Sequence, residues 1–215
     1  METIQNNPFD RYAHQYDLWF DKHNESYQLE LDAIRELLPT HGKGVEVGAG
    51  TGRFMGPLGI LSGIEPVVAM RSIAAERGLN IQQGVAENLP LISNSCDHLL
   101  FVTTLCFVDS AQQALQEAHR VLREDGILII GMIDRTSSLG KKYEESKGDS
   151  TFYHGANFYS IDEMIDMLQS AEFNHFQFRQ TLLPERKANT PSIINGYGKG
   201  AFVVIQAQKS NSDSS

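Results

Sequence analysis

Apolar residues recur along the chain with two periods, and each period predicts a type of element. A helical period over residues 9–20 comes from aromatic positions spaced three to four apart, Phe9, Tyr12, Tyr16 and the adjacent pair Trp19 and Phe20. A second helix is expected over residues 26–38, where Pro39 ends it. Residues 1–41 are therefore expected to form N-terminal helices that cover the rest of the molecule.

From residue 44 onward, short apolar runs alternate with helical patterns. The runs predicted as strands are 44–47, 59–64, 80–84, 97–102, 127–133, 175–183 and 200–208. The helices predicted beyond the N-terminal region are 66–78, 111–123 and 161–171, the last with Ser160 and Glu163 as a capping box. Continuous apolar runs suit parallel strands covered on both faces, so the pattern predicts an α/β fold with a doubly wound sheet. The last two runs follow each other without a helix, which favours an antiparallel arrangement between them.

The length and the order of these elements predict a single domain over residues 1–215. Its core would span residues 42–134, followed by an irregular covering segment at 135–160. A C-terminal helix and two strands would fill 161–209, and the polar residues 210–215 would form a frayed tail.

Composition narrows the function classes. The formal net charge of −9 argues against a protein that holds nucleic acid by neutralising phosphates. No apolar segment approaches the roughly 20 residues that span a bilayer, so no membrane partner is expected. Cys96 and Cys106 lack metal-ligand or CxxC spacing; we expect a cytoplasmic protein with Cys106 as a small buried residue and no metal site.

The stretch VEVGAGTGRF, residues 45–54, is a strand followed by glycines, a turn that lets a ligand approach the backbone closely. Its spacing is Gly48-x-Gly50-x-Gly52. A dinucleotide fingerprint would need a third glycine at the position of Arg53, and no lysine completes a Walker A motif. A pyrophosphate ligand is therefore weakly supported.

Acidic residues near the predicted strand ends indicate another ligand. Glu46 lies within the strand before the turn, where a carboxylate suits a cationic group. Glu65 ends the next strand, where it can accept ribose hydroxyls, and Ala86 with Glu87 follows the third strand. The ligand inferred from these positions has an adenosine-like part, a ribose and a positively charged amino-acid part.

This ordered set resembles the class I S-adenosylmethionine-dependent methyltransferases, specifically the small-molecule type that includes ubiquinone/menaquinone biosynthesis. The resemblance extends over nearly the whole chain through five segments in the right order, VEVGAGTGRF, GIEPVVAM, GVAENLPL, DHLLFVTTLCFVD and HRVLREDGILIIG. It implies a Rossmann-like fold with a mostly parallel seven-stranded sheet and an antiparallel C-terminal strand. One departure from the family is that Met55-Gly56-Pro57 breaks the helix after the glycines early.

The resemblance implies S-adenosylmethionine as the cofactor and assigns its neighbours by position. The methionine part would lie against Glu46, the turn and the residues after the fourth strand; the ribose would bind Glu65, and the adenine would lie between the remaining residues. The implied cofactor-binding residues are Glu46, Gly48, Ala49, Gly50, Gly52, Glu65, Pro66, Met70, Ala86, Glu87, Thr103, Thr104 and Leu105. For Met70, an ordinary core position is an equally good interpretation.

Methyl transfer from a sulfonium is an in-line displacement that depends mainly on alignment, so no catalytic residue is assigned. Tyr12, Tyr16 and Trp19 are candidates for the wall of an acceptor pocket, although an aromatic stripe also packs a helix onto a sheet. His154 is a candidate base on the irregular segment, and His14 is another. Residues 141–149 are expected to be a solvated charged segment.

The predicted function is methyl transfer to a small molecule of unidentified structure, with no statement on oligomeric state. Two alternatives remain open, a noncatalytic S-adenosylmethionine-binding protein and a nicotinamide-dependent oxidoreductase. Two features disfavour methylation of protein or nucleic acid. The net charge is negative, and TTLC follows the fourth strand, where such enzymes would need an Asn-Pro-Pro-Tyr-like motif.

Overall fold

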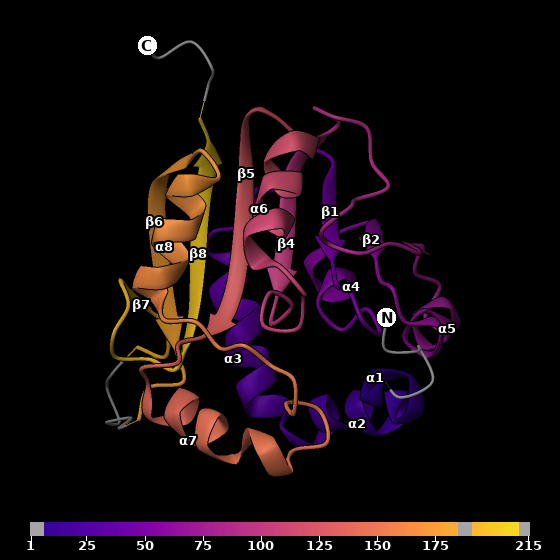
Figure 1. The fold of residues 1–215 in the computed structure, drawn as a ribbon, viewed down its shortest axis with the longest axis vertical. Helices are drawn as coiled ribbons and strands as arrows, with labels where there is room; N and C mark the ends of the chain where they lie inside the picture. Colours follow the sequence, from indigo (N-terminus) through magenta and orange to yellow (C-terminus); the bar gives the residue numbers. More distant parts are fainter. Residues whose placement is uncertain (1–6, 185–190, 211–215) are drawn as a thin grey trace.

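The computed structural model describes residues 7–184 and 191–210, and one eight-stranded sheet runs through it. The strand order is β3-β2-β1-β4-β5-β8-β6-β7 (Figure 1). The strands are β1 (Gly44–Val47), β2 (Ser62–Ile64), β3 (Ile81–Gln82), β4 (Cys96–Val102), β5 (Leu122–Ile133), β6 (Phe173–Thr181), β7 (Ile194–Asn195) and β8 (Phe202–Lys209). The first five are mutually parallel, whereas β8 runs antiparallel to both β5 and β6.

Helices cover both faces of this sheet. They are α1 (Pro8–Arg11), α2 (Ala13–Lys22), α3 (Asn24–Arg35), α4 (Met55–Leu58), α5 (Val68–Glu76), α6 (Ala111–Val121), α7 (Ser138–Ser146) and α8 (Ile161–Ser170), with a 3-10 turn at Lys147–Asp149. In Figure 1, α6 and α8 lie in front of the sheet and α3 lies behind it. The fold is therefore the doubly wound, mostly parallel α/β architecture that the sequence predicts.

Two hydrophobic clusters correspond to the two faces of the sheet. One contains Leu115 of α6 and Leu168 of α8, packed on alternate residues of β4 and β5 such as Leu99 and Leu128. The other contains Leu31 of α3, which packs against the opposite residues of the same strands. The strands are apolar on both faces because each face is covered by helices.

The predicted helix over residues 9–20 is interrupted. Tyr12 ends α1 and precedes α2 with φ −121° and ψ 27°, which is not helical. The aromatic periodicity continues across this break, so the sequence pattern alone does not reveal it. The predicted capping box of α8 is confirmed, since Ser160 accepts from the Glu163 amide and the Glu163 carboxylate accepts from the Ser160 amide.

Two predictions about irregular segments are wrong. The segment 135–160, predicted to be irregular, contains α7, which Ser137 caps. The stretch 141–149 is largely exposed, as expected for a solvated charged segment, although its first six residues are helical. The loop between the last two long strands contains β7, which pairs with β6 and raises the strand count from seven to eight. Both elements are rich in polar residues, so the apolar pattern of the sequence did not reveal them.

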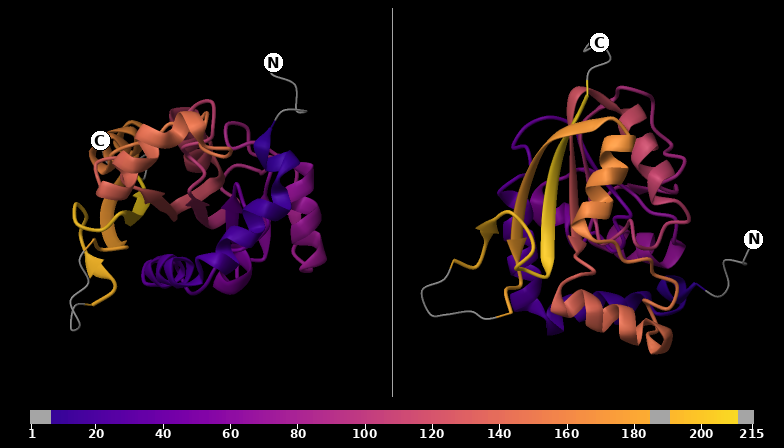
Figure 2. Two further views of the ribbon diagram at one scale, coloured as in Figure 1. Left: turned by 90° about the horizontal axis from the view of Figure 1, so that it is seen from below. Right: turned by 60° about the vertical axis from the view of Figure 1, so that its left-hand side comes forward.

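The carboxyl ends of the parallel strands face a cover made of three helices. In Figure 1, α1, α2 and α7 lie below the lower ends of β4 and β5, and the views in Figure 2 show α7 beneath the sheet. The predicted covering role of residues 135–160 agrees with this position. Most of the predicted tail, 211–215, lies outside the described residues. No helix in the described part of the chain is long and apolar enough to cross a bilayer.

Candidate functional site at the carboxyl end of the sheet

The glycine-rich turn is fixed to the neighbouring strand β2. The amides of Gly48 and Ala49 both donate to the carbonyl oxygen of Ile64, at 2.8 and 3.0 Å. The Gly50 amide donates to Oε2 of Glu65 at 2.9 Å, and the Val67 amide donates to Oε1 of the same carboxylate at 2.9 Å. The turn and the predicted ribose-binding carboxylate therefore form one hydrogen-bonded unit.

The three glycines of the turn differ in what surrounds them. All three have positive φ, which favours glycine. A Cβ on Gly48 would lie 2.2 Å from Cγ2 of Thr104, and a Cβ on Gly52 would lie 2.1 Å from Cδ1 of Leu79. A Cβ on Gly50 would meet no atom within 4 Å. Gly48 and Gly52 thus permit close packing within the protein, whereas Gly50 borders open space in which a ligand can lie.

Two buried carboxylates stand at the ends of neighbouring strands around the turn, Glu46 on β1 and Glu65 directly after β2. Burial raises the pKa of Glu65 despite the two amides that it accepts. Burial also raises the pKa of Glu46 well above its ordinary value. Oε2 of Glu46 is fully buried and has no hydrogen-bond partner among the described residues. Such an oxygen is costly to bury, and a cationic ligand group would compensate that cost.

A buried ion network joins the turn to α2, which sequence reasoning missed. Asp17 accepts from Oγ1 of Thr51 at 2.6 Å, from Nη2 of Arg53 at 2.7 Å and from Nη2 of Arg77 at 2.6 Å. Burial alone would raise the pKa of Asp17, but these hydrogen bonds outweigh it and hold the pKa below its ordinary value. Arg53, in the place of a dinucleotide-motif glycine, therefore binds the covering helix.

The predicted residues of the adenine side lie in different environments. Ala86 is buried in the cluster of the α6 face, and Pro66 is exposed. Met70 lies in a small cluster with Ala13 and Ile73, which favours its interpretation as a core residue. Oε1 of Glu87 accepts from the amides of Asp109 and Ser110, so this oxygen is used within the protein.

The residues after β4 line a small cavity. Thr103 has φ 49°, and Oγ1 of Thr104 donates to the Val47 carbonyl oxygen at 3.2 Å, which holds this loop against β1. The cavity has a volume of about 30 Å³, room for about two water molecules. It is lined by Phe101, Thr103, Thr104, Leu105, Cys106, Ile130, Gly131, Met132, Ile133, Tyr153, Phe158, Tyr159 and Met164.

Cys106 is half-buried and forms part of the cavity wall. Its Sγ donates to the Thr103 carbonyl oxygen at 3.2 Å, and burial raises the pKa of the thiol to about 12. The sulfur is therefore a neutral wall atom at neutral pH, which corrects the expectation of an ordinary core cysteine.

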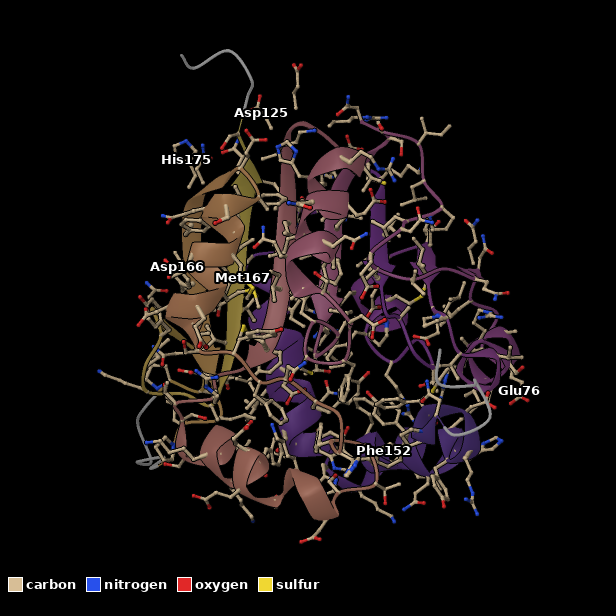
Figure 3. The ribbon with its side chains drawn as sticks, in the orientation of Figure 1. Glu76, Asp125, Phe152, Asp166, Met167 and His175 are labelled. Carbon is tan, nitrogen blue, oxygen red and sulfur yellow. The ribbon has the colours of Figure 1, made fainter. Side chains whose placement is uncertain are left out.

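Aromatic rings from three separate segments meet over the strand ends. Phe152, labelled in Figure 3, lies where the segment after α7 passes α1 and α2; its ring centroid is 5.5 Å from that of Phe9 and 5.6 Å from that of Tyr16. Phe9 also contacts Phe107 of the loop after β4, at 4.9 Å. We call the set of linked rings the aromatic cover: Phe9, Tyr16, Phe107, Tyr143, Phe152, Tyr153 and Phe158.

The four predicted acceptor-pocket residues are not brought together. The Tyr16 ring contacts Phe9 and Phe152 of the aromatic cover, and burial, with the nearby Glu65, raises the pKa of its hydroxyl. Trp19 stacks on His23 at 4.4 Å, and Tyr12 lies beneath the Arg11 guanidinium. His154 is exposed, its Nδ1 donates a hydrogen bond to the Gly148 carbonyl oxygen at 3.1 Å, and it does not line the cavity.

Glu30 of α3 is a second residue that the sequence interpretation missed. It is 6% exposed, and burial raises the pKa of its carboxyl to about 8. Burial is the main cause that raises the pKa values of Tyr16, Tyr143 and Tyr153 of the aromatic cover, and the charge of Glu30 adds to it. The sequence contains a feature that could have identified Glu30: its helical spacing puts it on the same buried face as Tyr27, Leu31 and Ile34.

The arrangement suits an organic ligand better than a metal ion. No group of three or more His, Cys, Asp or Glu side chains able to hold a metal occurs in residues 7–184 and 191–210. The donor set offers a ribose-binding carboxylate, a second carboxylate for a cation, and open space at a glycine. These features fit S-adenosylmethionine, which carries a ribose, a sulfonium and an ammonium group.

Comparisons with known proteins agree with this geometry. Residues 45–130 match the family model described as a methyltransferase domain. A protein of Methanocaldococcus jannaschii without a characterised function is 41% identical over 204 residues, covering 94% of this chain and 99% of the relative. A ubiquinone/menaquinone biosynthesis C-methyltransferase of Campylobacter jejuni is 39% identical over 72 residues, 33% of this chain and 31% of the relative.

A similar crystal structure comes from Thermotoga maritima. It is described as an S-adenosylmethionine-dependent methyltransferase and a possible histamine N-methyltransferase. The two chains superpose with a TM-score of 0.90 and share 45% sequence identity, over 94% of this chain and 99% of that chain. The similarity covers the N-terminal helices and the C-terminal strands as well as the core.

Proposed function

Because the chain belongs to the class I S-adenosylmethionine-dependent methyltransferases, we propose that it transfers a methyl group from S-adenosylmethionine to a small molecule. The observation that carries the proposal is the unit formed by the Gly50 amide and the Glu65 carboxylate at 2.9 Å, beside open space at Gly50. A ribose hydroxyl can reach the remaining lone pairs of Glu65, and the backbone at Gly50 leaves room for the rest of the cofactor.

The residues of the site divide the work of binding. Glu65 would hold the ribose, while the buried, unpartnered oxygen of Glu46 would stabilise a cationic group of the methionine part. When bound, S-adenosylmethionine supplies an activated methyl group, so the protein need not activate it further. The loop after β4 and the aromatic cover would align the acceptor in line with the sulfur and exclude water.

We propose a small-molecule acceptor because of the residues that line the cavity and the net charge of the chain. The cavity wall contains no lysine or arginine among the described residues, and the chain carries a formal net charge of −9. Both features disfavour a nucleic-acid acceptor. Two free cysteines agree with a reducing cytoplasmic setting. The description of the Thermotoga maritima protein as a possible histamine N-methyltransferase makes amines a reasonable first class of acceptor to test.

Replacing Gly50 with valine tests the location of the site. The new side chain would project into the open space beside Glu65, and we expect S-adenosylhomocysteine binding to weaken at least 30-fold, about 2 kcal/mol, by isothermal titration calorimetry. The protein should keep its fold, because a Cβ at this position meets no atom within 4 Å.

Gly59→Val is the matched control for backbone strain. Gly59 also has positive φ, 72°, and also has open space around its Cβ position, but it lies at the end of α4. Both variants should lose similar stability, whereas Gly59→Val should bind the cofactor normally. Equal affinities of the two variants for S-adenosylhomocysteine would show that the turn is not the cofactor site.

A further inference from the structure

A large cleft opens at the opposite end of β1 from the glycine-rich turn. Its walls are formed by the C-terminal ends of α3 and α4, the loop before β1 and the first residues of β1 and β2, together with His98 of β4. The cleft has a volume of about 720 Å³, which lies within the range of pockets that hold small organic molecules. We call it the amino-end cleft, because β1 and β2 begin there.

The charged side chains that line the amino-end cleft are basic. Arg35, His41, Lys43 and His98 line it, and no aspartate or glutamate of the described residues does. The chain as a whole has a formal net charge of −9, so this cleft is a local exception. A cleft lined by charges of one sign concentrates the opposite charge, and the amino-end cleft therefore favours an anionic ligand.

Two carboxylates near the cleft are already paired. Asp97 accepts from the Lys43 amide at 2.6 Å and from Nη1 of Arg123 at 2.6 Å. Asp32 pairs with Arg35, also at 2.6 Å. Within residues 7–184 and 191–210, the Lys43 ammonium has neither an ion pair nor a hydrogen bond. Lys43 is thus a cation of the cleft wall that is free to bind a ligand.

His98 is a buried imidazole, and its Nδ1 has no hydrogen-bond partner among the described residues. The residue is 5% exposed, and Nδ1 is fully buried. The next residues on the same face of β4 are Leu100 and Val102, both in the hydrophobic cluster of the α3 face. An unpaired polar atom in a core costs free energy, so packing alone would favour an apolar residue at position 98. A ligand-binding role explains an imidazole at this position better than packing does.

The other ring nitrogen of His98 lies against Gly44. These two residues are paired across β4 and β1, and both line the amino-end cleft. A Cβ on Gly44 would lie 2.0 Å from Nε2 of His98, although the φ of Gly44 is not positive and does not itself require glycine. The missing side chain therefore leaves room beside Nε2 at the cleft wall, where this nitrogen can donate a hydrogen bond to an anion.

The remaining part of the wall is largely apolar. Leu38, Leu58, Ile60 and Leu61 line the cleft together with the basic side chains. Leu61 is 82% exposed, so a ligand with an apolar part would gain free energy by covering it. The two kinds of wall together fit an organic molecule that carries an anionic group at one end.

We propose that the amino-end cleft binds a small organic phosphate monoester. Its phosphate group contacts Lys43, His41 and Nε2 of His98, and its apolar part packs on Leu38 and Leu61. A phosphate monoester has three terminal oxygens and a charge of about −1.5 to −2 at pH 7, so it accepts from more donors and neutralises more positive charge than a carboxylate. The site is separate from the cofactor site and does not depend on the proposed function.

Phenyl phosphate and hexyl phosphate are the probes for this ligand class. Each would be titrated into the wild-type protein near neutral pH by isothermal titration calorimetry, beside inorganic phosphate and the carboxylates benzoate and hexanoate. We expect at least one ester to bind with a submillimolar Kd, ten-fold or more tightly than inorganic phosphate and than its carboxylate. Esters that do not bind, or that bind no better than the carboxylates, would overturn the proposal.

Lys43→Gln and Lys22→Gln form a matched pair of variants. Both lysines are exposed, but Lys22 is the last residue of α2 and does not line the cleft. We expect Lys43→Gln to lose ten-fold or more in ester affinity, and Lys22→Gln to bind the ester as the wild type does. Equal affinities of the two variants would show that the ester is held only by diffuse charge, contrary to the proposal.

His98→Leu tests the buried ring, because leucine suits a core position and has no donor. We expect a folded protein that binds the ester at least ten-fold more weakly and S-adenosylhomocysteine as the wild type does. Wild-type ester affinity in a folded His98→Leu protein would contradict the placement of the phosphate group. If this variant does not fold, the comparison of the two lysine variants decides.

A competition experiment separates the two sites. The ester should bind equally well to wild-type protein with and without saturating S-adenosylhomocysteine. Loss of ester binding in the presence of S-adenosylhomocysteine would place the ester in the cofactor site, which overturns the inference and leaves the proposed function standing.

Discussion

Gly50 and Glu65 lie fifteen positions apart in sequence and form a hydrogen bond in the fold. Their types and their places at strand ends could be predicted, because glycine and carboxylate have specific uses in such turns. The different surroundings of the three glycines could not be predicted, because they depend on contacts with Thr104 and Leu79, which come from other parts of the chain. The sequence also does not show whether His154 faces the site or the solvent, because the residues around it are polar.

The burial of Glu30 predicts how the free energy of unfolding depends on pH. Its pKa is about 8 in the folded protein against an ordinary value of 4.5, because burial disfavours the charged form. The folded state therefore holds this proton more tightly than the unfolded state, and stability falls as the pH rises from 4.5 to 8. Glu30→Gln removes the effect, so the variant should exceed wild type in unfolding free energy by about 2–5 kcal/mol above pH 8 and by little near pH 4.

Urea denaturation of both proteins across this pH range measures that difference. Asp32→Asn serves as the control, since its side chain is exposed. A stability difference that does not grow with pH would contradict the burial of an uncompensated carboxyl at position 30.

At the scale of elements, the joint between α2 and the glycine-rich turn determines how the cover meets the core. Asp17 accepts from Thr51, Arg53 and Arg77, and Oη of Tyr27 on α3 donates to the Arg53 carbonyl oxygen. Helix positions could be predicted from periodicity, but this joint depends on which polar residues face each other across distant segments. The N-terminal helices are thus attached directly to the loop proposed to bind the cofactor.

Asp17→Asn is expected to weaken this joint. It leaves Arg77 without its carboxylate and Arg53 with the exposed Asp21 alone, and we expect unfolding free energy to fall by about 2–4 kcal/mol at pH 7, measured by urea denaturation. Because the folded pKa of Asp17 lies below its ordinary value, its contribution is present near neutrality and is lost as the pH falls below 4.

Asp21→Asn provides the comparison for that measurement. Asp21 also pairs with Arg53 but its side chain is 58% exposed, so its loss should cost about 0.2–1 kcal/mol. If both variants lose equal stability, the buried network contributes no more than a surface ion pair.

For the whole molecule, the order of strands and helices was predictable because each long element has a clear period and each strand end has a turn residue. The seven predicted strands all occur, including the two-residue β3, whereas β7 and α7 were missed because their sequences are rich in polar residues. The consequence matters for function, since α7 and the segment after it supply four of the seven rings of the aromatic cover, including Tyr143 and Tyr153. The part of the molecule proposed to select the acceptor was therefore the hardest to predict.

The carboxyl end of the sheet is the proposed binding site of S-adenosylmethionine. Isothermal titration of the wild-type protein with S-adenosylmethionine, S-adenosylhomocysteine and NADH tests it most directly. We predict one site per chain with micromolar dissociation constants for the first two ligands and no measurable heat with NADH. Binding of NADH, or the absence of binding by both adenosyl ligands, would contradict the claim.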